Sequence, residues 1–163
     1  MRSIWLSVAL LVGCDDSSKE TGDDGSGISA EDQATAEAIW SEIDGYESWG
    51  QFTGFEGIRA GTSVHTDFVQ VWFNDSALAS ISADSPLSDG DIGVKETYSD
   101  EAGTSLSNIT IYKVIDGFSA DHNDVFWARY SAAGDVQLAG EESGCYECHE
   151  SVDSDGDLIT VDE

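Results

Sequence analysis

Basic residues are scarce in this chain. Only 6 lysines and arginines stand against 33 aspartates and glutamates, which gives a formal net charge of −27 over 163 residues. Nucleic-acid binding needs a basic patch, and six scattered bases do not form one, so the composition excludes that class of protein. The same balance argues against docking by charge onto an anionic membrane. Apolar residues make up 40% of the chain, which is enough to build a core.

The sequence also lacks an apolar run of the roughly 20 residues that span a bilayer. Its longest run, residues 4–12, follows a short segment with one base, Arg2, and is typical of a secretory signal peptide. The run ends in Leu11-Val12-Gly13-Cys14, which resembles the lipobox of bacterial lipoproteins. That resemblance implies cleavage before Cys14 and acylation of its thiol. The alternative is an ordinary signal peptide with a chance cysteine.

Three regions follow from this pattern. Residues 1–13 are predicted to be a lipoprotein signal peptide, residues 14–28 a flexible acidic tether without a core, and residues 29–163 the folded domain. We expect the protein in the bacterial cell envelope, held by lipid and facing the periplasm. The sequence leaves open whether it sits in the inner or the outer membrane.

The folded domain is predicted to be α+β. Ser29 is a typical helix N-cap, an apolar stripe with helical spacing follows it, and Gly45 is a plausible stop. Short apolar runs separated by turn residues then indicate strands, and no helix-length segment separates most of them, so the sheet should be mainly antiparallel. The predicted strands cover residues 64–73, 92–98, 109–115, 125–130 and 136–138.

The strongest chemical signal is Cys145-Tyr146-Glu147-Cys148-His149, the C-x-x-C-H spacing of c-type haem attachment. Two thiols at this spacing bind the two vinyl groups of one porphyrin, and the adjacent histidine ligates the iron. A thioredoxin-like dithiol normally accompanies a βαβ unit, and a zinc site needs further ligands. A disulfide at this spacing would be strained. We therefore predict one covalent haem c, with a structural cysteine pair as the alternative.

Methionine is nearly absent. Met1 is the single methionine, so a chain processed at Cys14 has none, and the His/Met ligation of ordinary electron-transfer cytochromes c is excluded. The side chains left as a second axial ligand are mainly His65, His122 and the lysines. A five-coordinate iron with an open side is the main prediction, and a bis-histidine electron carrier is the alternative.

Several landmarks resemble the cytochrome P-460 and cytochrome c′-beta family. In order along the chain they are Tyr46-x-x-Trp49, His65 before Val71-Trp72-Phe73-Asn74, Gly90-x-x-x-Val94-Lys95-Glu96, Ile111-Tyr112-Lys113-Val114, Phe126-Trp127-Ala128-Arg129-Tyr130 and the C-x-x-C-H motif. His65-Thr66 departs from the His-Gly of many relatives. The resemblance implies an N-terminal helix, an antiparallel sheet, a homodimer and a five-coordinate haem with His149 as its axial ligand.

The resemblance leaves two activities open. Cytochromes P-460 oxidise hydroxylamine and carry a lysine cross-linked to the porphyrin, whereas cytochromes c′-beta bind nitric oxide or carbon monoxide without it. Lys95 lies where the cross-linking lysine falls, with an ordinary strand lysine as the alternative. The predicted partners are therefore a small nitrogen or diatomic gas ligand and a redox protein.

Hydroxylamine oxidation releases protons and needs a positioned base. If Lys95 faces the haem, the pleat of the strand turns Glu96 away from it. By position alone, Asp116, Asp121 and His122 are the candidate bases.

The acidic segment from Asp153 to Asp162 resembles part of a calcium-binding loop, although no helix pair flanks it. An acidic turn before a last strand at residues 158–161 is the alternative.

Overall fold

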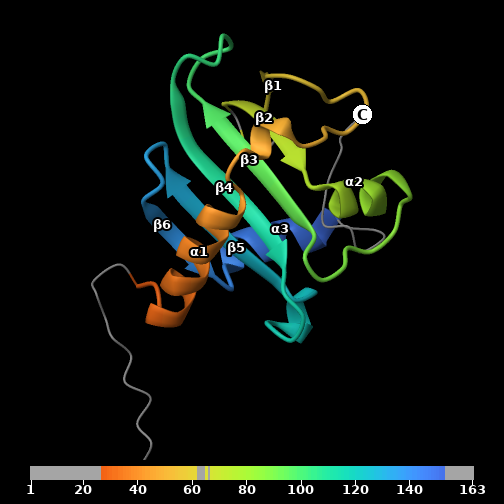
Figure 1. Ribbon diagram of the computed structural model, residues 1–163, viewed down its shortest axis with the longest axis vertical. Helices are drawn as coiled ribbons and strands as arrows, with labels where there is room; N and C mark the ends of the chain where they lie inside the picture. Colours follow the sequence, from red (N-terminus) through yellow and green to blue (C-terminus); the bar gives the residue numbers. More distant parts are fainter. Residues whose placement is uncertain (1–26, 62–64, 66, 153–163) are drawn as a thin grey trace, which may run out of the picture.

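The computed structural model describes residues 27–61, 65 and 67–152 (Figure 1). The predicted signal peptide, Cys14 and the acidic loop from Asp153 to Asp162 lie outside the described residues. The helices and strands are α1 (Ala30–Glu42), η1 (Tyr46–Ser48), β1 (Arg59–Ala60), β2 (Phe68–Phe73), α2 (Asp75–Ser82), β3 (Ile92–Tyr98), β4 (Leu106–Val114), η2 (Ala120–His122), β5 (Val125–Ser131), β6 (Val136–Gly140) and α3 (Ser143–Val152).

The strands form one six-stranded sheet in the order β1-β2-β3-β4-β5-β6, and every neighbouring pair is antiparallel. The prediction of an α+β fold with an antiparallel sheet after an N-terminal helix is confirmed. Because each strand pairs with the next along the chain, β3 and β4 occupy the centre of the sheet.

Helix α1 begins where the sequence indicated. The Ser29 side chain accepts a hydrogen bond of 3.0 Å from the Asp32 backbone N–H, which satisfies one of the free donors of the first turn. The helix ends at Glu42, and Gly45 follows with φ +77, a conformation that favours glycine. The predicted tether ended at residue 28, but Ile28 is 8% exposed and joins the core, so the packed domain starts one residue earlier.

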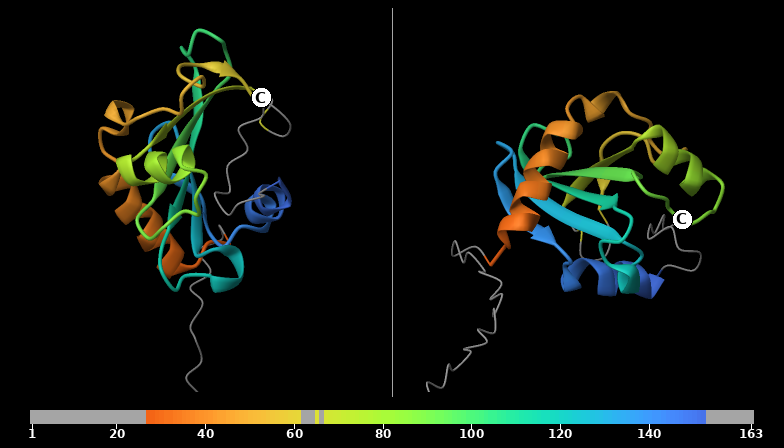
Figure 2. Two further views of the ribbon diagram at one scale, coloured as in Figure 1. Left: turned by 90° about the vertical axis from the view of Figure 1, so that its right-hand side faces the viewer. Right: turned by 60° about the horizontal axis from the view of Figure 1, so that its bottom comes forward.

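Two apolar clusters lie on opposite faces of the sheet, and α1 and α3 cover opposite faces (Figure 2). The α1-side cluster contains alternate residues of the central strands together with Ile39 and Ile43. The α3-side cluster contains the other residues of the same strands, side chains of α2, and Cys145 of α3. The alternation of each strand thus assigns every central side chain to one helix or the other.

The residues after β2 fold into a helix that the sequence analysis did not predict. Asn74 caps α2, because its Oδ1 accepts from the Ala77 backbone N–H at 3.0 Å and from the Ile92 backbone N–H at 3.2 Å. Its Nδ2 donates to the Gly90 carbonyl at 2.8 Å. One side chain therefore ties the start of α2 to the start of β3.

Two rows of facing residues cross the sheet on the α3 side. The first row runs Val71, Lys95, Thr110, Arg129 and Leu138, and the second runs Phe73, Gly93, Tyr112, Trp127 and Gly140. A Cβ atom at Gly93 would lie 2.4 Å from the Tyr112 ring, so the glycine leaves room for this ring to cross β3.

The replacement Ile111→Val should lower the free energy of unfolding by about 1 kcal/mol, because Ile111 is 1% exposed in the α1-side cluster and loses a methylene group. Chemical denaturation measures this loss. On the same strand, exposed Ser107 provides the control: Ser107→Ala should stay within about 0.5 kcal/mol. An equal loss in both variants would contradict the assignment of the two positions.

Candidate functional site

Helix α3 carries all three residues of the C-x-x-C-H motif. The backbone N–H groups of Cys145 and Tyr146 donate to the Glu142 carbonyl at 2.9 and 3.0 Å, which closes the first turn. Cys145 and His149 are four residues apart and so share one side of the helix. Cys145 packs into the α3-side cluster, while Cys148 is exposed, and both thiols are free.

His149 lies among side chains that the sequence analysis had singled out separately. Its ring centroid is 4.9 Å from that of Trp127, and 6.4 Å from that of His65. His65 precedes β2 and Trp127 lies on β5, so segments far apart in the sequence meet beneath α3. We call Lys95, His65, Trp127, Cys145 and His149 the α3 site.

Lys95 completes the α3 site from the central strand β3. Its Nζ lies 2.9 Å from Nδ1 and 3.1 Å from Nε2 of His65. Burial lowers the pKa of Lys95 to about 8, and the neighbouring Cys145 opposes this shift. His65 as a whole is exposed, but partial desolvation of its ring, followed by the charges of Lys95 and His149, lowers its pKa to about 4. At neutral pH the His65 ring is therefore neutral and accepts a hydrogen bond from the ammonium group.

Positive charge gathers at the α3 site despite the acidity of the domain. Lys95 and Arg129 share a row across the sheet and both act electrostatically on Cys145. Burial raises the pKa of the Cys145 thiol, Glu142 adds to the shift, and the two cations oppose it. Residues 29–163 hold only four lysines and arginines, so two of the four lie beside the cysteine helix.

Trp127 contributes a buried donor to the α3 site. Trp127 is 3% exposed, and its Nε1 has no hydrogen-bond partner among the described residues. A buried N–H without an acceptor costs free energy, roughly 1–3 kcal/mol, which an additional acceptor would recover. The indole therefore marks a position where a bound group with an acceptor atom would be stabilised.

The strand pleat separates Lys95 from Glu96 as predicted. Glu96 is 6% exposed on the α1 side of the sheet and accepts hydrogen bonds from the hydroxyl groups of Tyr46 and Tyr98. It is therefore not available as a base at the α3 site.

Two of the three candidate bases, Asp121 and His122, lie at η2. His122 stacks on Tyr146 with ring centroids 3.7 Å apart, and its Nδ1 lies 3.0 Å from Glu150 Oε1. Its Nε2 is 3.7 Å from Glu141 Oε1. These contacts hold η2 against α3. Asp121 is exposed, and the structure does not assign it a role as a base.

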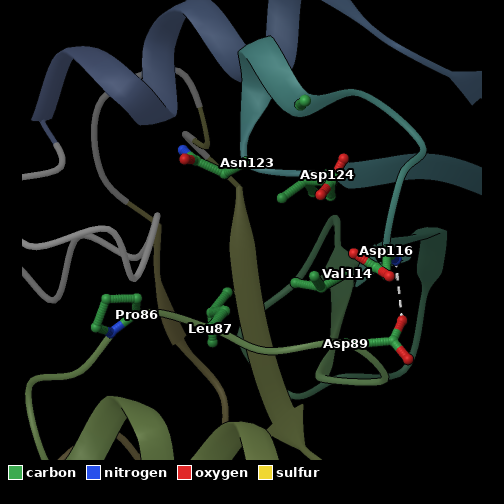
Figure 3. Close-up of a pocket in the computed structure, with 9 residues that line it drawn as sticks. Pro86, Leu87, Asp89, Val114, Asp116, Asn123 and Asp124 are labelled. Carbon is green, nitrogen blue, oxygen red and sulfur yellow. Dashed lines mark hydrogen bonds between the residues drawn. The ribbon is translucent and has the colours of Figure 1, made fainter.

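A cavity of about 480 Å³ lies between the loop before β3 and the loop around η2 (Figure 3). Asp116, a further candidate base, lines it, and its backbone N–H donates to Asp89 Oδ1 at 3.0 Å. The cavity is lined by Pro86, Leu87, Asp89, Val114, Asp116, Ala120, Asn123, Asp124 and Val125. None of these residues belongs to the α3 site, so the cavity is a separate feature of the fold.

The sequence analysis predicted a role in haem attachment, ligation or cross-linking for four of the five residues of the α3 site, namely Cys145, His149, His65 and Lys95. It missed the role of Trp127, which it used only as a landmark of the family resemblance. The alternation of side chains along β5 was the available signal, because it places Trp127 and Arg129 on the same face of that strand. That this is also the face of Lys95 becomes clear only when the strand order is known.

Within the described part of the chain, no three His, Cys, Asp or Glu side chains form a group suited to a metal ion. A haem takes only one or two iron ligands from the protein, so C-x-x-C-H attachment does not require such a group. Among residues 27–61, 65 and 67–152, no helix is long and apolar enough to cross a membrane. No protein-family model and no curated protein matches this chain.

Replacing Lys95 by methionine should stabilise the chain at pH 7 when it is expressed without haem attachment. The folded lysine has a pKa of about 8 against a usual 10.5, so the unfolded chain binds the proton more tightly. This penalty is complete below pH 8 and fades as the pH rises toward 10.5, so the gain should shrink over that window. Urea denaturation at pH 7, 8, 9 and 10 measures it.

Lys113→Met is the matched control. Lys113 pairs with Glu42 at 2.6 Å on the other face, and its loss should bring no stabilisation. A gain at Lys95→Met that stays constant with pH would contradict a buried lysine with a lowered pKa.

Proposed function

We propose that this chain is a c-type haem protein, with Cys145 and Cys148 as the attachment thiols and His149 as the axial iron ligand. The observation that carries the proposal is the position of α3. Cys145 and His149 lie on one side of a helix that packs on the sheet face of Lys95 and Trp127. His65, from the segment before β2, lies next to both Lys95 and His149.

The residues of this face suit a haem. Tyr112 and Trp127 offer flat apolar surface from the α3-side cluster. Lys95 and Arg129 supply positive charge for the propionates, and Trp127 Nε1 supplies a buried donor. Because α3 packs directly on the sheet, a porphyrin between them requires the helix to move outward.

When bound, a haem supplies an iron that takes small ligands or exchanges electrons. A chain processed at Cys14 has no methionine, so the chain offers no sulfur ligand of that type. We propose an open sixth position that takes nitric oxide or another small nitrogen species, or that oxidises hydroxylamine. His65 and Lys95 are the polar groups best placed to hold or move a proton beside such a ligand.

The cytochrome P-460 resemblance adds a covalent role for Lys95. Because the pKa of Lys95 is lowered to about 8, a larger fraction of its side chain is free amine at neutral pH than in an exposed lysine. The free amine is the form that bonds to carbon. Export, lipid anchoring at Cys14, a homodimer and a redox partner protein belong to the same proposal and rest on the sequence.

A second candidate function has one specific observation in its favour. His65 and His149 have ring centroids 6.4 Å apart. Two imidazoles ligating one metal ion through bonds of about 2 Å lie at roughly this separation. A bis-histidine electron carrier would therefore use His65, and it would not use His122, which Glu141, Glu150 and Tyr146 hold elsewhere.

Coexpression with a cytochrome c assembly system should give protein that keeps one haem after denaturation, scored by the pyridine haemochrome assay. Cys145→Ser and Cys148→Ser together should abolish this retention. His149→Ala should keep the covalent haem and lose the native ligand field. Haem that dissociates from the wild-type chain in denaturant would overturn the proposal.

The ferrous spectrum separates the two functions. An open iron predicts high-spin haem that binds carbon monoxide, and His65→Ala should leave its coordination number unchanged. A bis-histidine carrier predicts low-spin haem without carbon monoxide binding, which His65→Ala converts to a high-spin form. His122→Ala is the control, because its loss should leave the spin state unchanged in both cases.

A cross-link to Lys95 should appear as an anomalous red-shifted Soret band that Lys95→Met removes. An ordinary Soret band in the wild type would contradict the cross-link and leave gas binding as the activity.

A further inference from the structure

A buried carboxylate on the α1 side of the sheet is held by two phenols. Tyr46 of η1 donates to Glu96 Oε1, and Tyr98 of β3 donates to Glu96 Oε2. Tyr46 and Glu96 are each 6% exposed, whereas Tyr98 is partly exposed. None of the ion pairs formed among the described residues includes Glu96. Two phenol groups therefore supply the hydrogen bonds to this carboxylate.

The arrangement is suited to moving a proton from a phenol to Glu96. Burial and the hydrogen bond to Glu96 raise the pKa of both tyrosines above the usual value, so both phenols keep their protons at neutral pH. A phenol that loses an electron becomes a strong acid, so its proton must leave at once. A carboxylate already in hydrogen-bond contact is a competent acceptor.

Tyr46 also has an aromatic neighbour. Its ring meets that of Trp72 edge to face, with centroids 5.3 Å apart and planes at 75°. Trp72 lies on β2, where it pairs with Val94, next to Lys95. An indole at this separation offers a path for an electron between the phenol pair and the middle of the sheet.

The chain contains a matched contrast. Tyr130 is 0% exposed and donates to the Ala36 carbonyl at 2.8 Å. Burial raises its pKa as well. An amide carbonyl accepts a hydrogen bond but does not take the proton, so oxidation of Tyr130 has no acceptor in place.

We propose that Tyr46, Glu96 and Tyr98 form a proton-coupled redox site that gives one electron to a high-potential one-electron oxidant. One phenol loses an electron to the oxidant, which is reduced by one electron, and the phenol O–H bond breaks. The proton passes to Glu96, which becomes a carboxylic acid beside the neutral phenoxyl radical. A reductant returns the electron, and the proton moves back.

The shared carboxylate limits the site to one equivalent. Once Glu96 is protonated, the second phenol has no base, so the pair holds one radical and not two. Tyr98 is the partly exposed residue of the pair, so oxidants and reductants in solution reach the site through Tyr98. The site does not depend on the proposed haem, because all its contacts lie on the opposite face of the sheet.

The test is oxidation of the full chain by ruthenium(III) tris-bipyridine, which light generates from the ruthenium(II) complex with persulfate as electron acceptor. Freeze-trapping and electron paramagnetic resonance then detect the radical. The wild type should give a tyrosyl radical, at most one per chain. Glu96→Gln, which keeps an acceptor oxygen but is a far weaker base, should lower the yield severalfold. Tyr130→Phe should leave it unchanged.

Tyr46→Phe and Tyr98→Phe provide variants that each keep one phenol on Glu96. Each single variant should retain a radical at the other tyrosine, and the combination should lower the yield to that of Glu96→Gln. Radical formation in the wild type should slow in D₂O, which tests proton coupling even where Glu96→Gln fails to fold. An undiminished yield in folded Glu96→Gln, a radical lost in Tyr130→Phe, or no solvent isotope effect would overturn the proposal.

Discussion

The alternation of side chains along β3 is the constraint on which the rest of the structure depends. Lys95 and Glu96 are adjacent in sequence, yet the pleat directs one toward α3 and the other toward α1. Because β3 pairs with β2 and β4 over most of its length, a shift by one residue would exchange the two faces. The register therefore keeps a lowered-pKa amine and a buried carboxylate apart within one strand.

Each face then acquires its own chemistry. The α3 face collects a thiol, two imidazoles, an amine and an indole, drawn from α3, the segment before β2, β3 and β5. The α1 face is mostly apolar and holds one carboxylate between two phenols. The chain is strongly acidic and has only 6 lysines and arginines, and two of them, Lys95 and Arg129, lie on the α3 face.

Caps and side-chain periodicity in the sequence predicted the helix and strands whose formation depends mainly on neighbouring residues. The Ser29 cap, the α1 stripe and the alternation of β3 each appear where expected. The sequence did not predict helices α2 and α3. Helix α2 depends on the bond from Asn74 to β3, and only two residues separate α3 from the end of β6. The three-residue motif of α3 was found by spacing. The proximity of His149 to His65 and to Trp127 follows only once the strand order is known.

We propose that α3 carries one covalent haem. Intact mass spectrometry of the denatured full chain, matured with a cytochrome c assembly system, tests this most directly. The account predicts a mass increase equal to one haem that disappears when Cys145 and Cys148 are both changed to serine. An unmodified chain, or a haem adduct that survives the loss of both cysteines, would contradict it.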